Sequence, residues 1–480
     1  MTPKHTQPPL SPRQILASPS RNALRVMVGS ALSLTALAAQ STLAKEFEQI
    51  DLTSSVGQSL ILNDARVDYT GSGPAVWVSG AQNQLQGQDY DIRVTADPPY
   101  ASVVGVQVDT GGKAELSGVT ISTAGSDFAI GAHADGADSQ LTLNDVQITT
   151  SGNRSLGVVA SNGAQVLVAG GSISTSGDEA EALYARGTGS RIQASDLTLT
   201  ATGTGPLNVV RAADGTAIEL QRVSVQSSGF LGAVAVEGGG SLTFRNGSIN
   251  AEGDGITLRD MYRNPGGTAV VSHSRITSQN GHGIYVQTDQ ATADLDSVQI
   301  TSLGDHGTAI WMTGRNTRVN VKDSVLQTHG RSAVAIDNRD GVFTMDGGSI
   351  STLGDHAHAL YATLDSSHSP GAVINVSRVL IETSGNGAVG GRRWYGRGWR
   401  LRLRRGGGKH QPEQQPHRHP RRPQPRPARQ GPRRQRGTAR QRRANRRRAG
   451  LRPGHQRQCH GPRPGLDPGH QRQQRPWHRQ

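Results

Sequence analysis

The sequence lacks several features that common classes of protein require. Cys459 is the single cysteine among its 480 residues, so no internal disulfide can stabilise the chain, although secreted proteins often contain them. Aromatic residues make up only 4% of the chain, which is low for a globular protein with a wide core. Apolar residues show no sustained helical spacing, which argues against helical bundles. Beyond the N-terminal region, no segment reaches the roughly 20 apolar residues of a membrane-spanning helix.

What the sequence contains instead is one short repeated phrase. An aliphatic residue is followed by three or four mostly small polar residues and then by Gly, as in Ile121–Gly125 and Ile173–Gly177. The phrase occurs eleven times at intervals of 24 to 31 residues. Its aliphatic anchors are Ile121, Ile148, Ile173, Leu199, Val225, Ile249, Ile276, Ile300, Leu326, Ile350 and Ile381. Two weaker copies are anchored at Val67 and Val94. A period near 26 excludes most helical repeats, which run to roughly 33 to 47 residues.

Within one period the pattern is typical of β-strands. Apolar and polar residues alternate with a spacing of two, as in Leu141–Ile148. Each period also has a second apolar run, such as Ala180–Ala185 or Gly283–Val286, and Gly or Asn-Gly marks the joins where the backbone must turn. The sequence therefore predicts an all-β fold, a right-handed parallel β-helix of about 26-residue coils spanning residues 45–390. The thin interior of such a solenoid holds small and branched side chains, which accounts for the few aromatic residues.

The first 44 residues have the organisation of a secretory signal peptide. Arg21 and Arg25 precede the apolar stretch Val26–Ala39, and small residues suited to cleavage follow. Cleavage after Ala38 and cleavage after Ala44 both fit the pattern. We therefore expect the protein to be exported.

Repeated Gly-Ser-Ile units stand at Gly171–Ile173, Gly247–Ile249 and Gly348–Ile350. With the signal peptide and the cysteine-free coils rich in Gly, Ser, Thr and Ala, these units make residues 45–390 resemble the passenger of a pertactin-like autotransporter. That family comprises type V secreted adhesins and virulence factors of Gram-negative bacteria. The resemblance implies a β-helix at the cell surface or outer membrane, or released, that is normally followed by a β-barrel translocator. The alternating ten-residue strands of such a barrel are not found in this sequence.

The composition changes abruptly after Gly390. Residues 391–480 contain 28 of the 51 Lys and Arg residues and 2 of the 37 Asp and Glu residues, so this tail has a net charge of +26 and the preceding part −12. One interpretation is a natural disordered arm that binds nucleic acid or another polyanion. The other is translation of the same repeats in the wrong frame.

The genetic code favours the second interpretation of the tail. Read one nucleotide later, the codons of Lys409–Arg421 can encode S-I-N-L-S-N-S-R-I-A-T-R-G, which closely follows Ile374–Gly385. Those of Gln474–His478 can encode N-G-H-G-I, the phrase found in frame at Asn280–Ile284. We therefore predict that residues 391–480 are a disordered, out-of-frame tail, and that the frame changes between about Gly385 and Lys409. Such a truncated passenger, without its translocator, would reach the periplasm but not the cell surface.

Three aspartates are candidates for chemistry, because β-helical polysaccharide lyases and hydrolases use clustered carboxylates. These are Asp178, Asp305 and Asp355. The repeat places the last two about two coils, or roughly 10 Å, apart, which is too far for a retaining pair and marginal for an inverting one. Asp after Gly is also a favoured turn residue. His356 and His358 could share a strand face, but a pair without a third ligand predicts no metal site.

Surface binding without catalysis is the function that we predict, with a host-cell or matrix surface as partner. Aromatic residues that could form a binding strip, or stack as core residues, are Trp77, Tyr184, Tyr262, Tyr285 and Trp311. Three sequons are attributed to composition alone: Asn153, Asn246 and Asn375. No catalytic residue, cofactor or metal ligand is predicted, and nucleic acid is not an expected partner. The alternative is a secreted β-helix lyase or hydrolase acting on polysaccharide, which would need carboxylates from neighbouring coils to converge.

Overall fold

The computed structural model describes most of the predicted solenoid. The described residues are 25–27, 45–53, 57–98, 101–125, 127–203, 205, 208–259, 266–363, 371–393 and 400–404. Every regular element in them is a β-strand, and a helix that could cross a membrane is not found there. Two compact units divide the chain, Met1–His410 and Gln411–Gln480, and all described residues belong to the first. The all-β prediction is confirmed.

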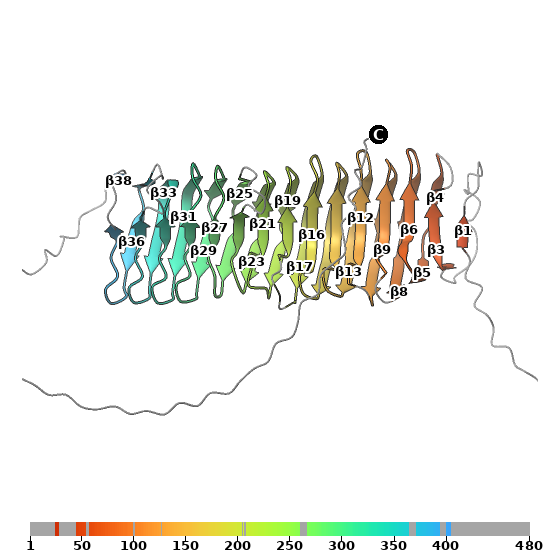
Figure 1. Ribbon diagram of the computed structural model, residues 1–480, viewed down its shortest axis with the longest axis horizontal. Helices are drawn as coiled ribbons and strands as arrows, with labels where there is room; N and C mark the ends of the chain where they lie inside the picture. The colour runs from red at the N-terminus through yellow and green to blue at the C-terminus, as the bar shows by residue number, and fades with distance from the viewer. Residues whose placement is uncertain are drawn as a thin grey trace, which may run out of the picture. The chain divides into compact units, whose positions relative to one another are not determined.

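The first sheet consists of parallel strands, one from each coil, and Figure 1 shows β3, β6, β9 and β12 side by side in chain order. In spatial order its 15 strands are β1 (Arg25–Met27), β3 (Gln49–Leu52), β6 (Gly73–Ser79), β9 (Val103–Asp109), β12 (Ile130–Asp135), β14 (Leu156–Ser161), β16 (Glu181–Arg186), β18 (Val210–Ala212), β21 (Val234–Glu237), β24 (Ile256–Arg259), β27 (Ile284–Val286), β30 (Ile310–Met312), β32 (Ile336–Asn338), β34 (Leu360–Ala362) and β37 (Gly391–Arg393).

The second sheet bends at one corner in every coil, so that its parallel strands form two flat parts, which we call its two faces. Five long strands run through both of them and join them: β13 (Gln140–Ser151), β15 (Gln165–Ser176), β17 (Arg191–Ala201), β31 (Arg318–Thr328) and β33 (Gly341–Thr352). The other strands of one face are β4 (Ser59–Ile61), β7 (Gln84–Gln88), β10 (Lys113–Ser117), β19 (Ala217–Gln221), β22 (Ser241–Arg245), β25 (Thr268–Ser272), β28 (Thr292–Asp296), β35 (Ala372–Ser377) and β38 (Arg400–Arg404). Those of the other face are β2 (Lys45–Phe47), β5 (Ala65–Gly71), β8 (Tyr90–Ala96), β11 (Thr120–Ala124), β20 (Ser224–Ser227), β23 (Ser248–Ala251), β26 (Arg275–Ser278), β29 (Gln299–Ser302) and β36 (Leu380–Thr383).

The repeat anchors found in the sequence form one in-register column of the second sheet. Each of the eleven, from Ile121 to Ile381, pairs with the anchors of its neighbouring coils, which gives ten successive pairings. The column continues towards the N-terminus through Ile92 and Val67. The predicted anchor Val94 is therefore wrong by two residues, because a shift of two along a strand returns an inward-facing, equally apolar position. In this register each coil stacks on the next with a spacing of about 4.8 Å.

The core is a single continuous cluster of small and branched side chains inside the coils. Burial alternates along the strands, as in Leu141 and Leu143, which are almost fully buried on either side of half-exposed Thr142. Large buried side chains are few, with Phe244 and Phe343 among them. The shortage of aromatic residues is thus explained by a narrow interior in which each coil contributes mainly Val, Ile, Leu and Ala.

Two kinds of position require special backbone. The corner between the two faces of the second sheet is made in most coils by one residue with positive φ, for example Asp145 (50°), Asp196 (55°) and Asn246 (55°), and by the pairs Gly170–Gly171 and Gly347–Gly348 in two others. Gly-Ser-Ile units follow this corner, and a Cβ on Gly171 would lie 1.9 Å from the carbonyl oxygen of Val146 in the preceding coil. Glycine is therefore required there by the close approach of two backbones.

Both ends of the predicted solenoid show strands outside its predicted limits. Strand β1, inside the predicted signal peptide 1–44, pairs with β3, and the other residues of that range lie outside the described part. Strands β37 and β38, inside the predicted tail 391–480, pair with β34 and β35. Regular pairing thus continues past residue 390. The predicted disorder and frame change concern residues that otherwise lie outside the description.

Candidate functional site

Asp305 and Asp355 lie at the same corner of coils two steps apart, as the repeat predicted. The Oδ1 atom of Asp305 accepts a hydrogen bond of 2.7 Å from the backbone N–H of Arg331, and that of Asp355 accepts one of 2.8 Å from Asn386. Each carboxylate therefore fastens its own corner to that of the next coil. The turn interpretation is correct, but the bond goes to the neighbouring coil rather than to the local backbone.

Asp178 takes part in a similar series of hydrogen bonds between corners of neighbouring coils. Its Oδ1 accepts a hydrogen bond of 2.9 Å from the N–H of Gly205, and its own N–H donates to Oδ1 of Asn153 over 3.1 Å. The backbone N–H of Asn153 donates in turn to Asp127. The sequon residue Asn153 is thus a structural link between coils. Because these side chains hold backbone groups, they do not converge on a common point as a catalytic pair would.

The two histidines predicted to share a face lie in different environments. His356 is exposed and has a φ of 58°, whereas His358 is only 5% exposed. The Nδ1 atom of His358 accepts a hydrogen bond of 3.2 Å from the backbone N–H of Val389. Within the described ranges, three or more His, Cys, Asp or Glu side chains do not gather anywhere in a metal-binding arrangement.

Four of the five predicted aromatic residues lie in one outward-facing row of the first sheet, and Tyr262 lies outside the described residues. We call this the first-sheet row; its members are Asp51, Trp77, Gln107, His133, Val159, Tyr184, Arg211, Ala235, Thr257, Tyr285, Trp311, Asp337 and Tyr361. The rings do not form a free strip. Tyr285 and Trp311 stack on each other with centroids 4.6 Å apart, and Arg339 covers the Trp311 ring at 4.8 Å.

An ion-pair network that the sequence did not reveal occupies the middle of this face. Arg211 contacts Glu237 at 3.0 Å and Glu181 at 3.4 Å, and Arg259 contacts Glu237 at 2.5 Å. The ring of Tyr184 lies 5.0 Å from the Arg211 guanidinium. Burial raises the pKa of Glu181 to about 7, and the charge of Arg211 offsets only part of that shift. The repeat pattern hides this network, because its members occupy four different coils.

A chain of hydrogen bonds also runs across the N-terminal coils of the same face. His133 contacts the Gln107 side chain through Nδ1 (2.9 Å) and the Ser161 hydroxyl through Nε2 (2.7 Å), and that hydroxyl donates to Asp135 over 2.5 Å. Burial lowers the pKa of His133. Ser161 is fully buried, so a substrate cannot reach its hydroxyl, and the chain joins coils rather than forming a nucleophile.

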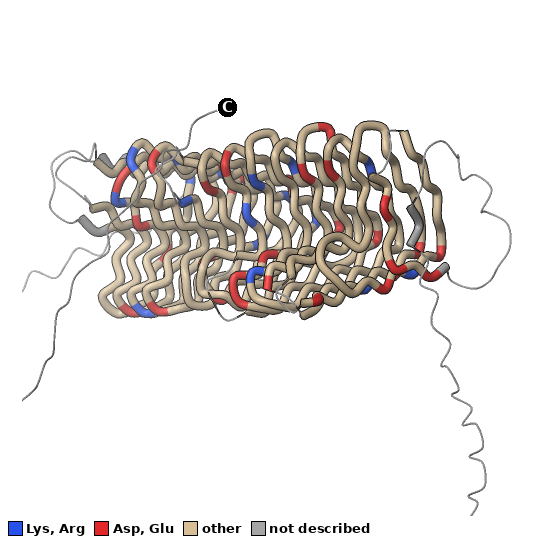
Figure 2. The backbone as a smooth tube through the Cα atoms, turned by 45° about the vertical axis from the view of Figure 1, so that its right-hand side comes forward, with Lys and Arg blue, Asp and Glu red and all other residues tan. Residues whose placement is uncertain are grey.

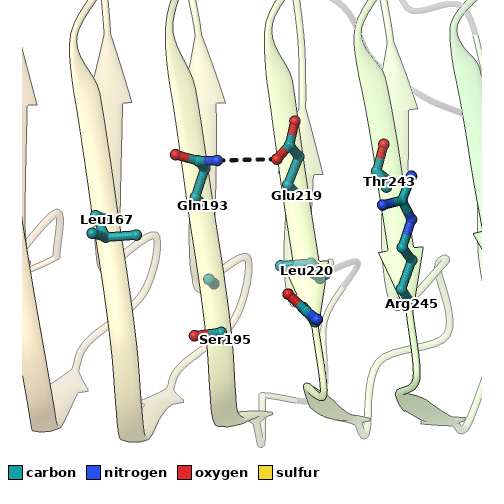
Figure 3. A pocket seen from close by; sticks show the side chains of 9 residues that line it. Leu167, Gln193, Ser195, Glu219, Leu220, Thr243 and Arg245 are labelled. Atoms are coloured by element: carbon teal, nitrogen blue, oxygen red, sulfur yellow. Dashed lines mark hydrogen bonds between the residues drawn. The ribbon is translucent and has the colours of Figure 1, made fainter.

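The second sheet has a shallow groove of about 190 Å³ on its outward surface, shown in Figure 3. Its polar lining comes from successive coils: Gln193, Glu219, Thr243 and Arg245, with the apolar side chain of Leu167 at one end. The Gln193 amide donates to Glu219 over 3.1 Å. The groove is not visible in the sequence, because its residues recur at intervals of 24 to 26 residues and only the coil register brings them together.

Charge is distributed without a large patch of one sign. Figure 2 shows acidic and basic residues interspersed over the described coils, with many acidic residues at the bends of the tube. Most ion pairs join neighbouring coils, as in Arg222 with Asp196 at 2.6 Å and Arg154 with Glu179 at 2.8 Å. Within the described coils, charges of both signs therefore alternate over short distances.

Comparison with known proteins adds one remote likeness. No family model matches the sequence, and no curated protein matches it. Among solved structures the chain resembles "Crystal Structure of the periplasmic alginate epimerase AlgG", with a TM-score of 0.32 and 12% sequence identity over 64% of this chain and 76% of that one. The likeness is too remote to inform the function of this chain.

Proposed function

We propose that the chain is the passenger fragment of a pertactin-like autotransporter, and that it binds a host-cell or matrix surface without catalysing a reaction. The N-terminal residues typical of a signal peptide and the Gly-Ser-Ile repeats support export and the family. Recognition would use an extended face of the solenoid, as repeat proteins commonly do.

The observation that carries this proposal is a continuous outward row on the second sheet, which we call the second-sheet row. It presents one exposed or half-buried side chain per coil over twelve coils, which is about 50 Å. Its members are Gln86, Glu115, Thr142, Leu167, Gln193, Glu219, Thr243, Val270, Asp294, Asn320, Thr344 and Asn375. Regularly spaced hydroxyl, amide and carboxylate groups suit a long polar partner.

A surface-binding assay tests the proposal. Labelled full-length chain is incubated with cultured epithelial cells and with immobilised extracellular matrix, and binding is compared with a variant in which Thr142, Val270 and Thr344 of the row are changed to Lys. The proposal expects saturable binding that this variant loses. Binding that survives the triple change, or that a peptide of residues 391–480 alone reproduces, would contradict it.

Export is tested separately. In a Gram-negative host, the fragment should appear in the periplasmic fraction and stay inaccessible to protease added to intact cells. Surface exposure would show that the chain does not need a translocator of its own, and retention in the cytoplasm would remove the basis for the signal peptide.

A second candidate, an enzyme acting on polysaccharide, is favoured by one observation. Glu181 and Glu237 come from different coils and approach the same guanidinium of Arg211, which is the clustering of carboxylates with a basic residue that such an enzyme would need. Incubation of the full chain with acidic polysaccharides, followed by detection of new reducing ends and of unsaturated products by ultraviolet absorbance, tests it. Turnover that Glu181→Gln abolishes would favour the enzyme over the binding protein.

A further inference from the structure

Two arginines and one carboxylate lie in or beside the groove of Figure 3, so its net charge is positive. Arg191 contacts Glu219 at 2.5 Å. Desolvation would raise the pKa of Glu219, but hydrogen bonds from Gln193 and Arg191, with the charges of Arg191 and Arg245, hold it below its usual value. Glu219 is therefore an ionised carboxylate that Arg191 already neutralises.

Arg245 is the charge that remains. It is exposed at the end of β22, and among the residues that the structure describes it forms no ion pair within 4.0 Å. Together with Arg191 and Glu219 it gives the groove a local charge of about +1. An anionic group on a ligand would find a guanidinium there with its donors available for two parallel hydrogen bonds.

The rest of the lining suits a hydroxyl-rich molecule. Gln193, Gln221 and Thr243 offer both donors and acceptors within reach of one ligand. Leu167, 42% exposed, adds an apolar surface at the edge of the groove, which matches the C–H face of a sugar ring. The volume of about 190 Å³ is below the range of about 300 to 1,000 Å³ typical of pockets that enclose a drug-sized ligand. One ring therefore fits in the groove, and a longer chain would continue along the sheet.

We propose that this groove binds a carboxylated sugar residue of an acidic glycan, with Arg245 holding the carboxylate and Gln193, Thr243 and Gln221 holding hydroxyl groups. This inference rests on the proposed surface-binding function and gives it a ligand class. The groove belongs to the second-sheet row, since four of its lining residues (Leu167, Gln193, Glu219 and Thr243) are members, and glycan units on either side would contact neighbouring coils.

Titration of the full chain with glucuronic acid and with glucose, followed by ligand-observed saturation-transfer NMR, tests the inference. Glucuronic acid should bind at least about tenfold more tightly than glucose, because the guanidinium recognises the carboxylate. Arg245→Gln should weaken glucuronic acid by about tenfold and leave glucose unchanged. The matched control is Arg275→Gln, which removes another exposed arginine of the second sheet and should change neither affinity by more than about twofold.

A second pair of variants tests the apolar wall. Leu167→Asp removes the apolar surface that the sugar ring would contact and should weaken glucuronic acid, whereas Val325→Asp, on an equally exposed residue at 40%, should not. Equal losses for Arg245→Gln and Arg275→Gln, or equal affinities for the acid and for glucose, would overturn the inference. If glucuronic acid does not bind but the chain still binds to cells, the proposed ligand of the groove is wrong and the surface-binding function stands. If neither binds, both fail.

Discussion

The outward faces of the two sheets differ, although each repeats once per coil. The second-sheet row has no buried member from Gln86 to Asn375. In the first-sheet row Val159 and Ala235 are fully buried, and the charged or aromatic residues beside them pair with one another. The first sheet therefore uses its outward side chains to hold coils together. The second-sheet row also has bonds between coils, as from Asn320 to Asp294, but all its members stay exposed or half-buried and within reach of a partner.

The same chemistry has different consequences on these two faces. An arginine and a carboxylate that are both removed from water depend on each other, because either one alone would be a buried, uncompensated charge. An exposed pair of the same composition gains little, since water and salt replace the partner. Substitutions on the first sheet should consequently change stability, and those on the second sheet should change binding.

The largest effect is expected from Arg211→Leu. Glu181, with 8% of its side chain exposed, would lose its cation, and removal of one partner of a buried pair costs about 3 to 5 kcal/mol. Urea unfolding at pH 8, where Glu181 is ionised, measures the loss of free energy of unfolding. The double variant with Glu181→Gln should recover part of it. A loss below about 1 kcal/mol would show that the network behaves like a surface pair.

The next effect is a pair of opposite pH dependences. The folded pKa of Glu181 is raised to about 7, so its stabilising contribution is complete below the unfolded value near 4.5 and is lost as the pH rises through 7. The folded pKa of His282 is lowered by burial to about 4, so its contribution is complete above 6.5 and is lost as the pH falls through 4. Each shift corresponds to about 3 kcal/mol.

Comparison of variants separates these two contributions. Relative to the wild type, Glu181→Gln should gain about 3 kcal/mol in free energy of unfolding as the pH rises from 4.5 to 8. His282→Gln should be more stable than the wild type at pH 4.5, because it has no buried imidazole to protonate, and this difference should disappear as the pH rises to 8. Denaturant unfolding at several pH values measures both differences, and other groups cancel in them. Parallel pH profiles for the wild type and Glu181→Gln would contradict the buried position of this carboxyl.

The fold was largely predictable from the sequence, because a β-solenoid repeats one local rule. Each anchor from Ile121 to Ile381 needs only the next one to establish the register, so alternation, period and glycines together determine the stacking. The error at Val94 shows the limit of that rule. Where Ile92 and Val94 both face inward, local alternation cannot decide which of them continues the column.

The candidate sites were much less predictable. Turn aspartates such as Asp305 have a recognisable local pattern, and their role was anticipated. Arg211 and Arg245 have none, since the ion-pair partners of Arg211 are 26 and 30 residues away in sequence and the groove beside Arg245 is assembled from successive coils. Which outward residue is covered and which is exposed depends on neighbouring coils and loops. A repeat period gives proximity between coils but not the burial that decides charge and function.

A smaller loss of stability is expected from Trp311→Leu. The change removes the stack with Tyr285 and the contact with Arg339, and we expect a loss of about 2 kcal/mol from ring stacking and the cation–π contact together. Trp77→Leu is the matched control, because Trp77 lies in the same row and its indole N–H makes one hydrogen bond of 2.9 Å to Asp109. That variant should lose about 1 kcal/mol. Equal losses would mean that the stack adds nothing.

The smallest effect should come from the exposed pair of Asp196 and Arg222, on the second sheet. Both side chains are 51% exposed and lie 2.6 Å apart, so Asp196→Asn exchanges an ion pair for contacts with water. Asparagine also tolerates the φ of 55° found at Asp196, which keeps the corner intact. The unfolding midpoint should stay within experimental error of the wild type, at low and at high salt. A clear loss would mean that the second sheet also relies on its outward charges, and the division of labour between the two faces would fail.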